Sequence, residues 1–317
     1  MTSPQDILTQ NILPYWLALR DPIHGGFYSQ VRSDETIVQD APRGGILYAR
    51  ILWSFAAAYR VLQRPEYLAA ADTAKTFIEA HMLDPHDGAA YWSVSADGQP
   101  LDNTRPPVVQ AYMLYAYSEY VRATRDTDAL QRALSFYRLL QACPLDDEDT
   151  NLHLMEAFTN LYRVAPSDHL RTALITVIDS FAHRPSPTRF NAGHCIECSW
   201  LLSEAAEVAG VNRDSLVRQL AQEAAQGFNE DGTLDDGEWW KQAEAVIGFS
   251  NLYRRYGDES AHAIALRSWQ LICSHYIDFT HGEWFWLLLP DGTPDTSKDK
   301  VSFWKCPYHN TRLCLYL

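Results

Sequence analysis

The feature that most constrains the fold of this chain is a repeated pair of helical segments. Nearly every long segment places apolar residues at helical spacing, and almost none shows the two-residue alternation of a strand. Each segment that is apolar almost all round is followed by a more polar, amphipathic one, with a period of roughly 40 to 60 residues. Six such pairs predict two concentric rings of helices, an all-α (α/α)₆ barrel. The alternative is an open superhelical stack, which would need polar end caps.

The sequence predicts twelve helices. A first amphipathic helix covers 5–20, and the last helix covers 307–317, with Pro307 at its start. The segments predicted to be buried are 44–62, 106–124, 150–164, 194–209 and 238–256. Their amphipathic partners are 65–82, 126–143, 167–183, 213–228 and 259–276. Glycines predict loops or hairpins at 21–28, at 84–105 with a turn at Asp97-Gly98, and at 283–292.

Composition limits the class of protein. The 317 residues are 47% hydrophobic and show no linker or change of composition, so we expect one domain over 1–317. The net charge of −14 argues against nucleic acid or an anionic membrane surface as a partner. No apolar run is long enough to span a bilayer, and the N-terminus lacks signal-peptide features. Six cysteines indicate reduced thiols, so we expect a cytoplasmic protein. The ten Trp and seventeen Tyr suit either a sugar-binding cleft or a large helical core.

Three histidines stand at the start of helices that line the predicted ring, namely His153, His194 and His309. One such histidine would be an ordinary core residue, but three at equivalent places in a repeat indicate a site. His153 and His194 are each followed three residues later by a glutamate, Glu156 and Glu197, on the same helix face. A nearby carboxylate orients an imidazole and raises its basicity. Imidazoles are suited to moving a proton on and off carbon.

Three other interpretations of these residues compete. Cys195-x-x-Cys198 with Cys306-x-x-His309 has zinc-like spacing, although the halves lie far apart on predicted helices. The same Cys195-x-x-Cys198 pair as a redox centre lacks the strand-to-helix setting of such motifs. Two His-x-x-Glu motifs are similar to those of di-metal helical bundles, but the residue order is reversed.

Charged residues also occur within the apolar segments. Arg50 lies inside the buried segment 44–62, where an unpaired guanidinium would be costly. It therefore points into a polar cavity or forms a structural salt bridge. Trp240 and Glu244 lie four residues apart and so share one face of their helix.

The sequence resembles the N-acylglucosamine 2-epimerase family, and specifically its cellobiose 2-epimerase-like branch. The matching motifs run in family order over almost the whole chain. They are His24-Gly25-Gly26-Phe27-Tyr28, Ala49-Arg50-Ile51-Leu52-Trp53-Ser54-Phe55, His153-Leu154-Met155-Glu156-Ala157-Phe158-Thr159-Asn160-Leu161, Gly193-His194-x-Ile196-Glu197-x-Ser199-Trp200-Leu201-Leu202, Glu238-Trp239-Trp240-x-Gln242-Ala243-Glu244-Ala245-Val246, Gly282-Glu283-Trp284-Phe285-Trp286 and Trp304-Lys305-Cys306-Pro307-Tyr308-His309-Asn310.

This resemblance implies an (α/α)₆ barrel that epimerises a reducing-end aldose at C2 without metal or cofactor, with ketose formation as a side branch. The substrate would be a free mono- or disaccharide, and the enzyme a monomer or homodimer. By motif, His309 and His194 would exchange the C2 proton, and His153 would assist ring opening. The remaining implied residues are Arg50 on the enediolate oxygens, Glu197 and Glu244 on hydroxyls or histidines, and Trp304, Trp240, Trp239, Trp200 and Tyr112 as walls of the sugar pocket.

The chain also departs from the branch. The loop from 143 to 150 is very short, and the connection 184–191 is clipped. Asp149 and Asn151 stand where the branch tends to have Asn and His. Since these loops would form the rim of the cleft, we expect a more open cleft that still epimerises.

Two further functions remain open. The first is an inverting glycoside hydrolase on the same toroid, with Asp235, Asp236 and Glu238 as its carboxylates. It leaves the three histidines without a role. The second is a sugar-binding homologue that kept the pocket and lost catalysis through loop shortening.

Overall fold

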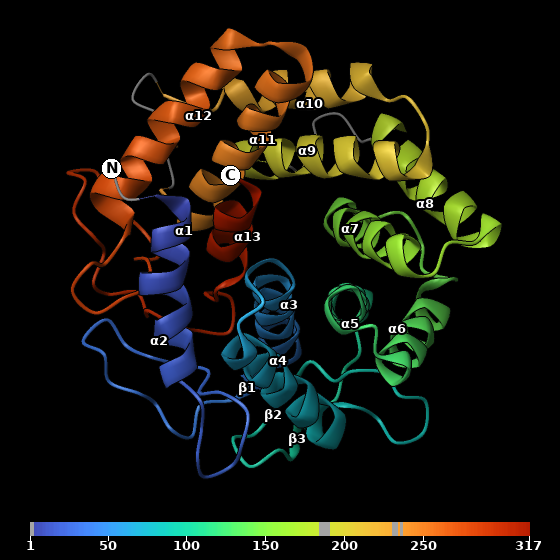
Figure 1. The fold of residues 1–317 in the computed structure, drawn as a ribbon, viewed down its shortest axis with the longest axis vertical. Helices are drawn as coiled ribbons and strands as arrows, with labels where there is room; N and C mark the ends of the chain where they lie inside the picture. The colour runs from blue at the N-terminus through green and yellow to red at the C-terminus, as the bar shows by residue number, and fades with distance from the viewer. Residues whose placement is uncertain (1–2, 184–190, 230–233, 235–236) are drawn as a thin grey trace.

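Six helices form an inner ring in the computed structural model, which describes residues 3–183, 191–229, 234 and 237–317 (Figure 1). They are α3 (Gly45–Leu62), α5 (Pro107–Thr124), α7 (Glu148–Val164), α9 (Ala192–Ala209), α11 (Trp239–Tyr256) and α13 (Tyr308–Tyr316). None of the helices in these described residues is long and apolar enough to cross a membrane.

A second set of helices packs around the outside of this ring. It consists of α1 (Pro4–Ile7) and α2 (Leu13–Ala18), joined by the π-helical turn Leu8–Ile12, then α4 (Pro65–Phe77), α6 (Thr127–Leu140), α8 (Asp168–Ser180), α10 (Asp214–Ala225) and α12 (Glu259–Leu271). Short turns extend α4 by Ile78–Met82, α8 by Phe181–His183 and α12 by Ile272–Tyr276. The twelve predicted helices are therefore confirmed, with ends that differ by a few residues.

The ring closes on itself. Each inner helix contacts the next one along the chain, and α13 packs against both α11 and α3. Five hairpins pair an inner helix with the outer helix that follows it, whereas α13 takes its outer partner from the N-terminal helix. The predicted (α/α)₆ barrel is confirmed, and the open superhelical stack is wrong because α13 bridges its two ends.

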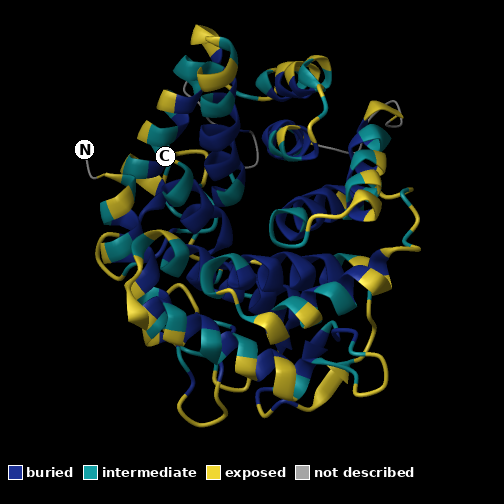
Figure 2. Cartoon of the chain, turned by 45° about the vertical axis from the view of Figure 1, so that its right-hand side comes forward, coloured by how far each residue is buried: buried dark blue, intermediate teal, exposed yellow. Residues whose placement is uncertain are grey.

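The burial pattern explains why the two sets of helices separate (Figure 2). In α3 every residue from Gly45 to Ala58 is buried, because neighbours cover this helix on all sides. In α4 only one stripe is buried, at Tyr67, Ala70, Ala71, Ala74 and Phe77. This spacing of three and four residues marks a helix that presents one face to the core and the other to water.

Short strands lie before the inner helices at one end of the barrel. β1 (Arg43–Gly44), β2 (Ser93–Val94) and β3 (Pro100–Asp102) form an antiparallel sheet in that order. Gly98 has φ +86°, which the turn between β2 and β3 requires, so the hairpin predicted at Asp97-Gly98 is confirmed. Leu288 and Pro294 form an antiparallel bridge around a turn at Gly292. The sheet joins the loops before α3 and α5, and a bridge between Glu238 and Leu287 joins the segments before α11 and α13.

A buried carboxylate joins the two ends of the chain. Glu283 accepts hydrogen bonds from Trp16 Nε1 of α2 (2.7 Å), from Asn310 Nδ2 of α13 (2.6 Å) and from Lys305 Nζ (2.6 Å). The Glu283 and Lys305 side chains are fully buried. Lys305 has no other carboxylate partner in the described part of the chain. Glu283 therefore holds the start of α13 against the first helix.

We expect Glu283→Gln to destabilise the protein by about 3–5 kcal/mol, because it leaves the Lys305 ammonium buried without a counter-charge. Urea denaturation followed by far-UV circular dichroism measures this difference. The matched control is Glu207→Gln, which removes an exposed ion pair with Arg255 and should cost under about 1 kcal/mol. Equal effects of the two substitutions would contradict the role given to Glu283.

Candidate active site

A cavity of about 300 Å³ opens where the inner helices begin. It is lined by Arg50, Val108, Tyr112, Asp149, His153, His194, Glu197, Glu238, Trp239, Trp240, Trp286, Trp304 and His309. Nine of the eleven predicted site residues are in this set, and Trp200 and Glu244 are not. A larger cavity of about 440 Å³ lies beside α6 and α8, and none of the predicted site residues lines it.

His194 and His309 reach this cavity from different helices and contact the same indole. The His194 ring lies 4.8 Å from the Trp240 ring, and the His309 ring lies 5.5 Å from it, between ring centroids. His194 is the third residue of α9, and its backbone N–H donates to the Asn191 side chain at 2.9 Å. His309 is the second residue of α13. Both imidazoles therefore sit in the first turn of an inner helix and face one cavity.

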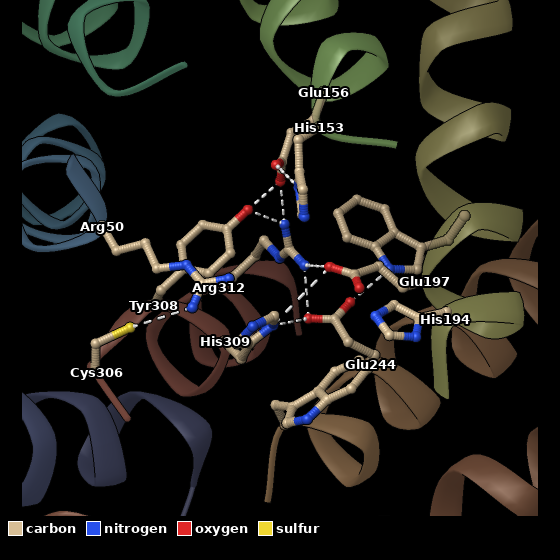
Figure 3. A network of polar contacts seen from close by, with 12 residues as sticks. Arg50, His153, Glu156, His194, Glu197, Glu244, Cys306, Tyr308, His309 and Arg312 are labelled. Atoms are coloured by element: carbon tan, nitrogen blue, oxygen red, sulfur yellow. Dashed lines mark hydrogen bonds and ion pairs between the residues drawn. The ribbon is translucent and has the colours of Figure 1, made fainter. Parts of the chain in front are cut away.

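Arg312 lies behind the cavity and holds three carboxylates (Figure 3). Its Nη2 donates to Glu197 Oε1 and to Glu244 Oε1, each at 2.6 Å. Its Nη1 donates to Glu156, which also accepts from the Tyr308 hydroxyl. The guanidinium is fully enclosed, and Tyr308 and Trp200 cover it with their ring faces. One cation thus fixes acidic residues of three inner helices.

Glu244 links this cation to His309. His309 Nδ1 lies 2.8 Å from Glu244 Oε1 and 4.0 Å from Glu197 Oε1. Glu244 Oε2 accepts from Trp200 Nε1 at 2.7 Å, so Trp200 and Glu244 form a layer behind the imidazole. A carboxylate on Nδ1 fixes the ring orientation and leaves Nε2 as the nitrogen for chemistry.

His153 belongs to a second chain of polar contacts. Its Nε2 lies 3.0 Å from the Tyr112 hydroxyl, and its Nδ1 lies 3.5 Å from Glu156 Oε2. Arg50 donates to the Tyr112 hydroxyl and also reaches the Trp304 carbonyl at 3.4 Å. Among the described residues no carboxylate pairs with Arg50, so the alternative of a structural salt bridge is wrong and its charge faces the cavity. Because α7 begins at Glu148, His153 lies in the second helical turn rather than the first.

The three imidazoles differ in their electrostatics. Burial holds the pKa of His309 well below its usual range, and burial also lowers the pKa of His194. Burial acts in the same direction on His153, but the hydrogen bond to Glu156 and the charge of Asp149 outweigh it and raise the pKa. His194 and His309 therefore release a proton more readily than a free histidine does, whereas His153 holds its proton more tightly.

The metal-site alternatives do not match the arrangement of the side chains. In the part of the chain that the structure describes, two groups of three residues bring potential ligand atoms within 4.8 Å, namely Glu35, Asp278 and His281, and Glu197, Glu244 and His309. Neither group contains Cys195, Cys198 or Cys306, so the zinc-like set is not assembled. In the first group, Lys300 Nζ lies 3.0 Å from Glu35 and 2.5 Å from Asp278. In the second, Arg312 already contacts both carboxylates.

Several residues of this site were not predicted from the sequence. Arg312, Tyr308 and Trp286 were given no functional role, and Glu156 was seen only as a partner of His153. The sequence does contain a signal for a functional role of Arg312. It is a charged residue in a terminal helix that docks on the core, just as Arg50 is a charged residue in the buried segment 44–62. Three carboxylates share Arg312 because three inner helices meet there. The spacing of residues along the chain does not reveal which helices meet.

Comparison with known proteins agrees with this geometry. A family model described as N-acylglucosamine 2-epimerase matches residues 25–185 and 178–310. The chain is 34% identical to a cellobiose 2-epimerase of Bacteroides fragilis, over 99% of this chain and 97% of the relative. It is 32% identical to a cellobiose 2-epimerase of Ruminococcus albus, over 97% and 95%. The solved cellobiose 2-epimerase of Bacillus thermoamylovorans superposes with a TM-score of 0.92 at 31% identity, over 99% and 97%.

The buried carboxylates predict a pH dependence of stability. Burial would raise the pKa of Glu156, but Arg312 and His153 outweigh burial and lower it from 4.5 to about 2. A carboxylate with a depressed pKa stabilises the fold above about pH 4.5, and this contribution is lost as the pH falls toward 2. We expect Glu156→Gln to cost about 1–3 kcal/mol at pH 7 and progressively less below pH 4.5.

Urea denaturation at a series of pH values measures this difference between wild type and variant. Glu207→Gln, which changes an exposed carboxylate, serves as the control and should stay close to wild type throughout. A Glu156→Gln deficit that does not change with pH would show that the lost contact is steric rather than ionic.

Proposed function

Since the chain belongs to the N-acylglucosamine 2-epimerase family, we propose that it is a carbohydrate 2-epimerase. It interconverts the C2 epimers of a reducing-end aldose of the glucose and mannose type, free or within a β-1,4 disaccharide. The reaction removes the proton from C2, passes through a cis-enediolate and returns a proton to either face. The same enediolate also permits aldose–ketose isomerisation.

The observation that carries this proposal is the pair His194 and His309, two imidazoles with lowered pKa that line one cavity and both contact Trp240. Epimerisation needs one group on each face of C2, and each must be able to take or give a proton near neutral pH. We assign these roles to His194 and His309. Glu244 holds His309 so that its Nε2 can point to the sugar.

Arg50 supplies the charge that a developing enediolate needs. A proton next to a carbonyl becomes removable only when the anion is stabilised as it forms. The Arg50 guanidinium is buried, lines the cavity and lacks a carboxylate partner in the described residues. His153, which is linked to Arg50 through Tyr112, is placed to assist opening of the sugar ring. Trp239, Trp240 and Trp304 offer faces for the sugar.

The occupant of the carboxylate cluster supports metal-independent chemistry. Arg312 Nη2 lies 2.6 Å from Glu197 and 2.6 Å from Glu244, where a divalent ion would have to bind. A second cation at that place would be repelled by the guanidinium. All six cysteines lie in the described residues, and none of them forms a disulfide there, which supports a cytoplasmic location.

The hydrolase alternative is not favoured. Glu238 lines the cavity, but it accepts from Trp240 Nε1 (3.0 Å) and Trp286 Nε1 (3.3 Å) and pairs with Lys241 (3.1 Å). These donors already engage both Glu238 oxygens, whereas a general acid needs an oxygen directed at the leaving group. Asp235 and Asp236, the other carboxylates considered, lie outside the described residues.

We expect the wild-type protein to exchange the C2 proton of at least one of glucose, mannose, cellobiose and lactose with solvent in D₂O, and to produce its C2 epimer. Proton NMR follows both the loss of the C2 signal and the new anomeric signals. Release of a monosaccharide from a disaccharide would indicate a hydrolase instead. Thermal stabilisation by sugar without any exchange would indicate a binding protein.

Replacing one histidine at a time tests which face of C2 each imidazole serves. We expect His194→Asn and His309→Asn each to reduce epimerisation by about 10²–10⁴-fold, because an amide cannot transfer the proton. Each variant should keep C2 exchange with only one epimer, and the two variants should keep it with opposite epimers. His169→Asn, at a histidine that lines the other cavity, is the matched control and should leave the rate unchanged. Retained exchange with both epimers in either variant would overturn the assignment.

A further inference from the structure

Asp149 is an acidic residue of the cavity that the roles given above do not use. It is the second residue of α7, its side chain is 56% exposed, and it lines the cavity. Its Oδ1 lies 3.8 Å from His153 Nε2, one helical turn further along α7. The same oxygen lies 3.8 Å from His194 Nε2, which α9 supplies. One carboxylate oxygen therefore faces the outward nitrogens of two imidazoles from two helices.

Other charged and titratable groups surround each imidazole. His153 has Glu156 on its Nδ1 side and the Tyr112 hydroxyl on its Nε2 side, with Glu197 further away. His194 has Glu197 on its own helix and Lys241 on α11, whose ammonium opposes protonation. Glu156 and Glu197 are held by Arg312, so most of their charge is compensated.

Asp149 differs from these carboxylates because no arginine or lysine pairs with it among the described residues. Two imidazoles that are both protonated in one cavity repel each other, which is why His153 lowers the pKa of His194. A carboxylate near both offsets this repulsion, and Asp149 acts on both histidines in the direction of a higher pKa.

We propose that Asp149 is a positioning residue of the epimerase site that couples the charge of His153 to that of His194. The inference rests on the proposed function. When His194 takes the C2 proton, its imidazolium forms beside His153, and the Asp149 carboxylate compensates the added charge. A protonated His309 then gives a proton to the opposite face of C2, and exchange with solvent takes the proton from His194 and restores that of His309, so the cycle needs no co-reactant.

Asp149→Asn removes the charge and keeps the shape. At 3.8 Å and with partial exposure, a unit charge shifts the pKa of each imidazole by roughly 0.5–1 unit. We expect the pKa values of His153 and His194 both to fall by this amount in the variant. His309, which is bound to Glu244 and Glu197, should not move and is an internal control.

Histidine titrations by ¹⁵N NMR on the full chain measure these shifts without reference to turnover. Glu148→Gln is the matched control, since Glu148 is also in the first turn of α7 but does not line the cavity. Asp149→Glu keeps the carboxylate and should keep both histidines closer to their wild-type pKa values than Asp149→Asn does. The pH–rate profile of epimerisation should move to lower pH in Asp149→Asn alone.

The outcomes distinguish this inference from the proposed function. If the pKa values of both His153 and His194 fall in Asp149→Asn but the wild type shows no C2 exchange, the coupling stands and the epimerase proposal fails. If the wild type epimerises but the pKa falls for only one of the two histidines, or for neither, the coupling is overturned and the epimerase proposal stands. Should Asp149→Asn fail to fold, Asp149→Ser, which also removes the charge, replaces it in the same titrations against Glu148→Gln, and both histidine pKa values should fall in Asp149→Ser only.

Discussion

The site depends on one buried guanidinium. Arg312 contacts Glu156, Glu197 and Glu244, which belong to three different inner helices, and it stands on a fourth. Without that cation, three carboxylates would be buried together, and their mutual repulsion would have to be relieved by protonation or by water. Because the cation is part of the chain, it compensates the charge of these carboxylates, and Glu244 and Glu156 orient His309 and His153 in front of them. The closing helix of the barrel therefore also assembles the chemistry.

This arrangement divides the site into two layers with different tasks. The rear layer of Arg312, Glu244 and Trp200 is closed to solvent and sets ring orientation. The front layer holds the imidazoles and Arg50, whose polar atoms face the cavity. Burial keeps the imidazole of His309 neutral although carboxylates lie behind it, because loss of hydration opposes its charged form. A neutral imidazole is the form that can take a proton from carbon.

Much of the fold could be predicted from the sequence because its periodicity is local. A helix that is apolar on all sides, such as α3, and a helix with one apolar stripe, such as α4, differ in the pattern of apolar residues within a few turns. That pattern already assigns α3 to the inner ring and α4 to the outer one. The front layer could also be predicted, since histidines at helix starts and Arg50 stand out in apolar surroundings. The rear layer could not. Trp200 was expected to wall the sugar pocket, and the structure places it behind Glu244 as a hydrogen-bond donor. Which face of an inner helix looks inward depends on ring closure, which no single segment encodes.

The short loop before α7 and the chemical groups occupy different parts of the molecule. The imidazoles, Arg50 and the carboxylates all stand on inner helices, which their neighbours hold over their whole length. The loop before α7 leads to the rim, where Asp149 in the first turn of α7 is 56% exposed and Trp304, in the loop before α13, is 45% exposed. Shortening a loop changes what covers the sugar but leaves the orientation of the imidazoles to the helices. Loss of rim residues should therefore alter which sugars bind before it alters how a proton is moved.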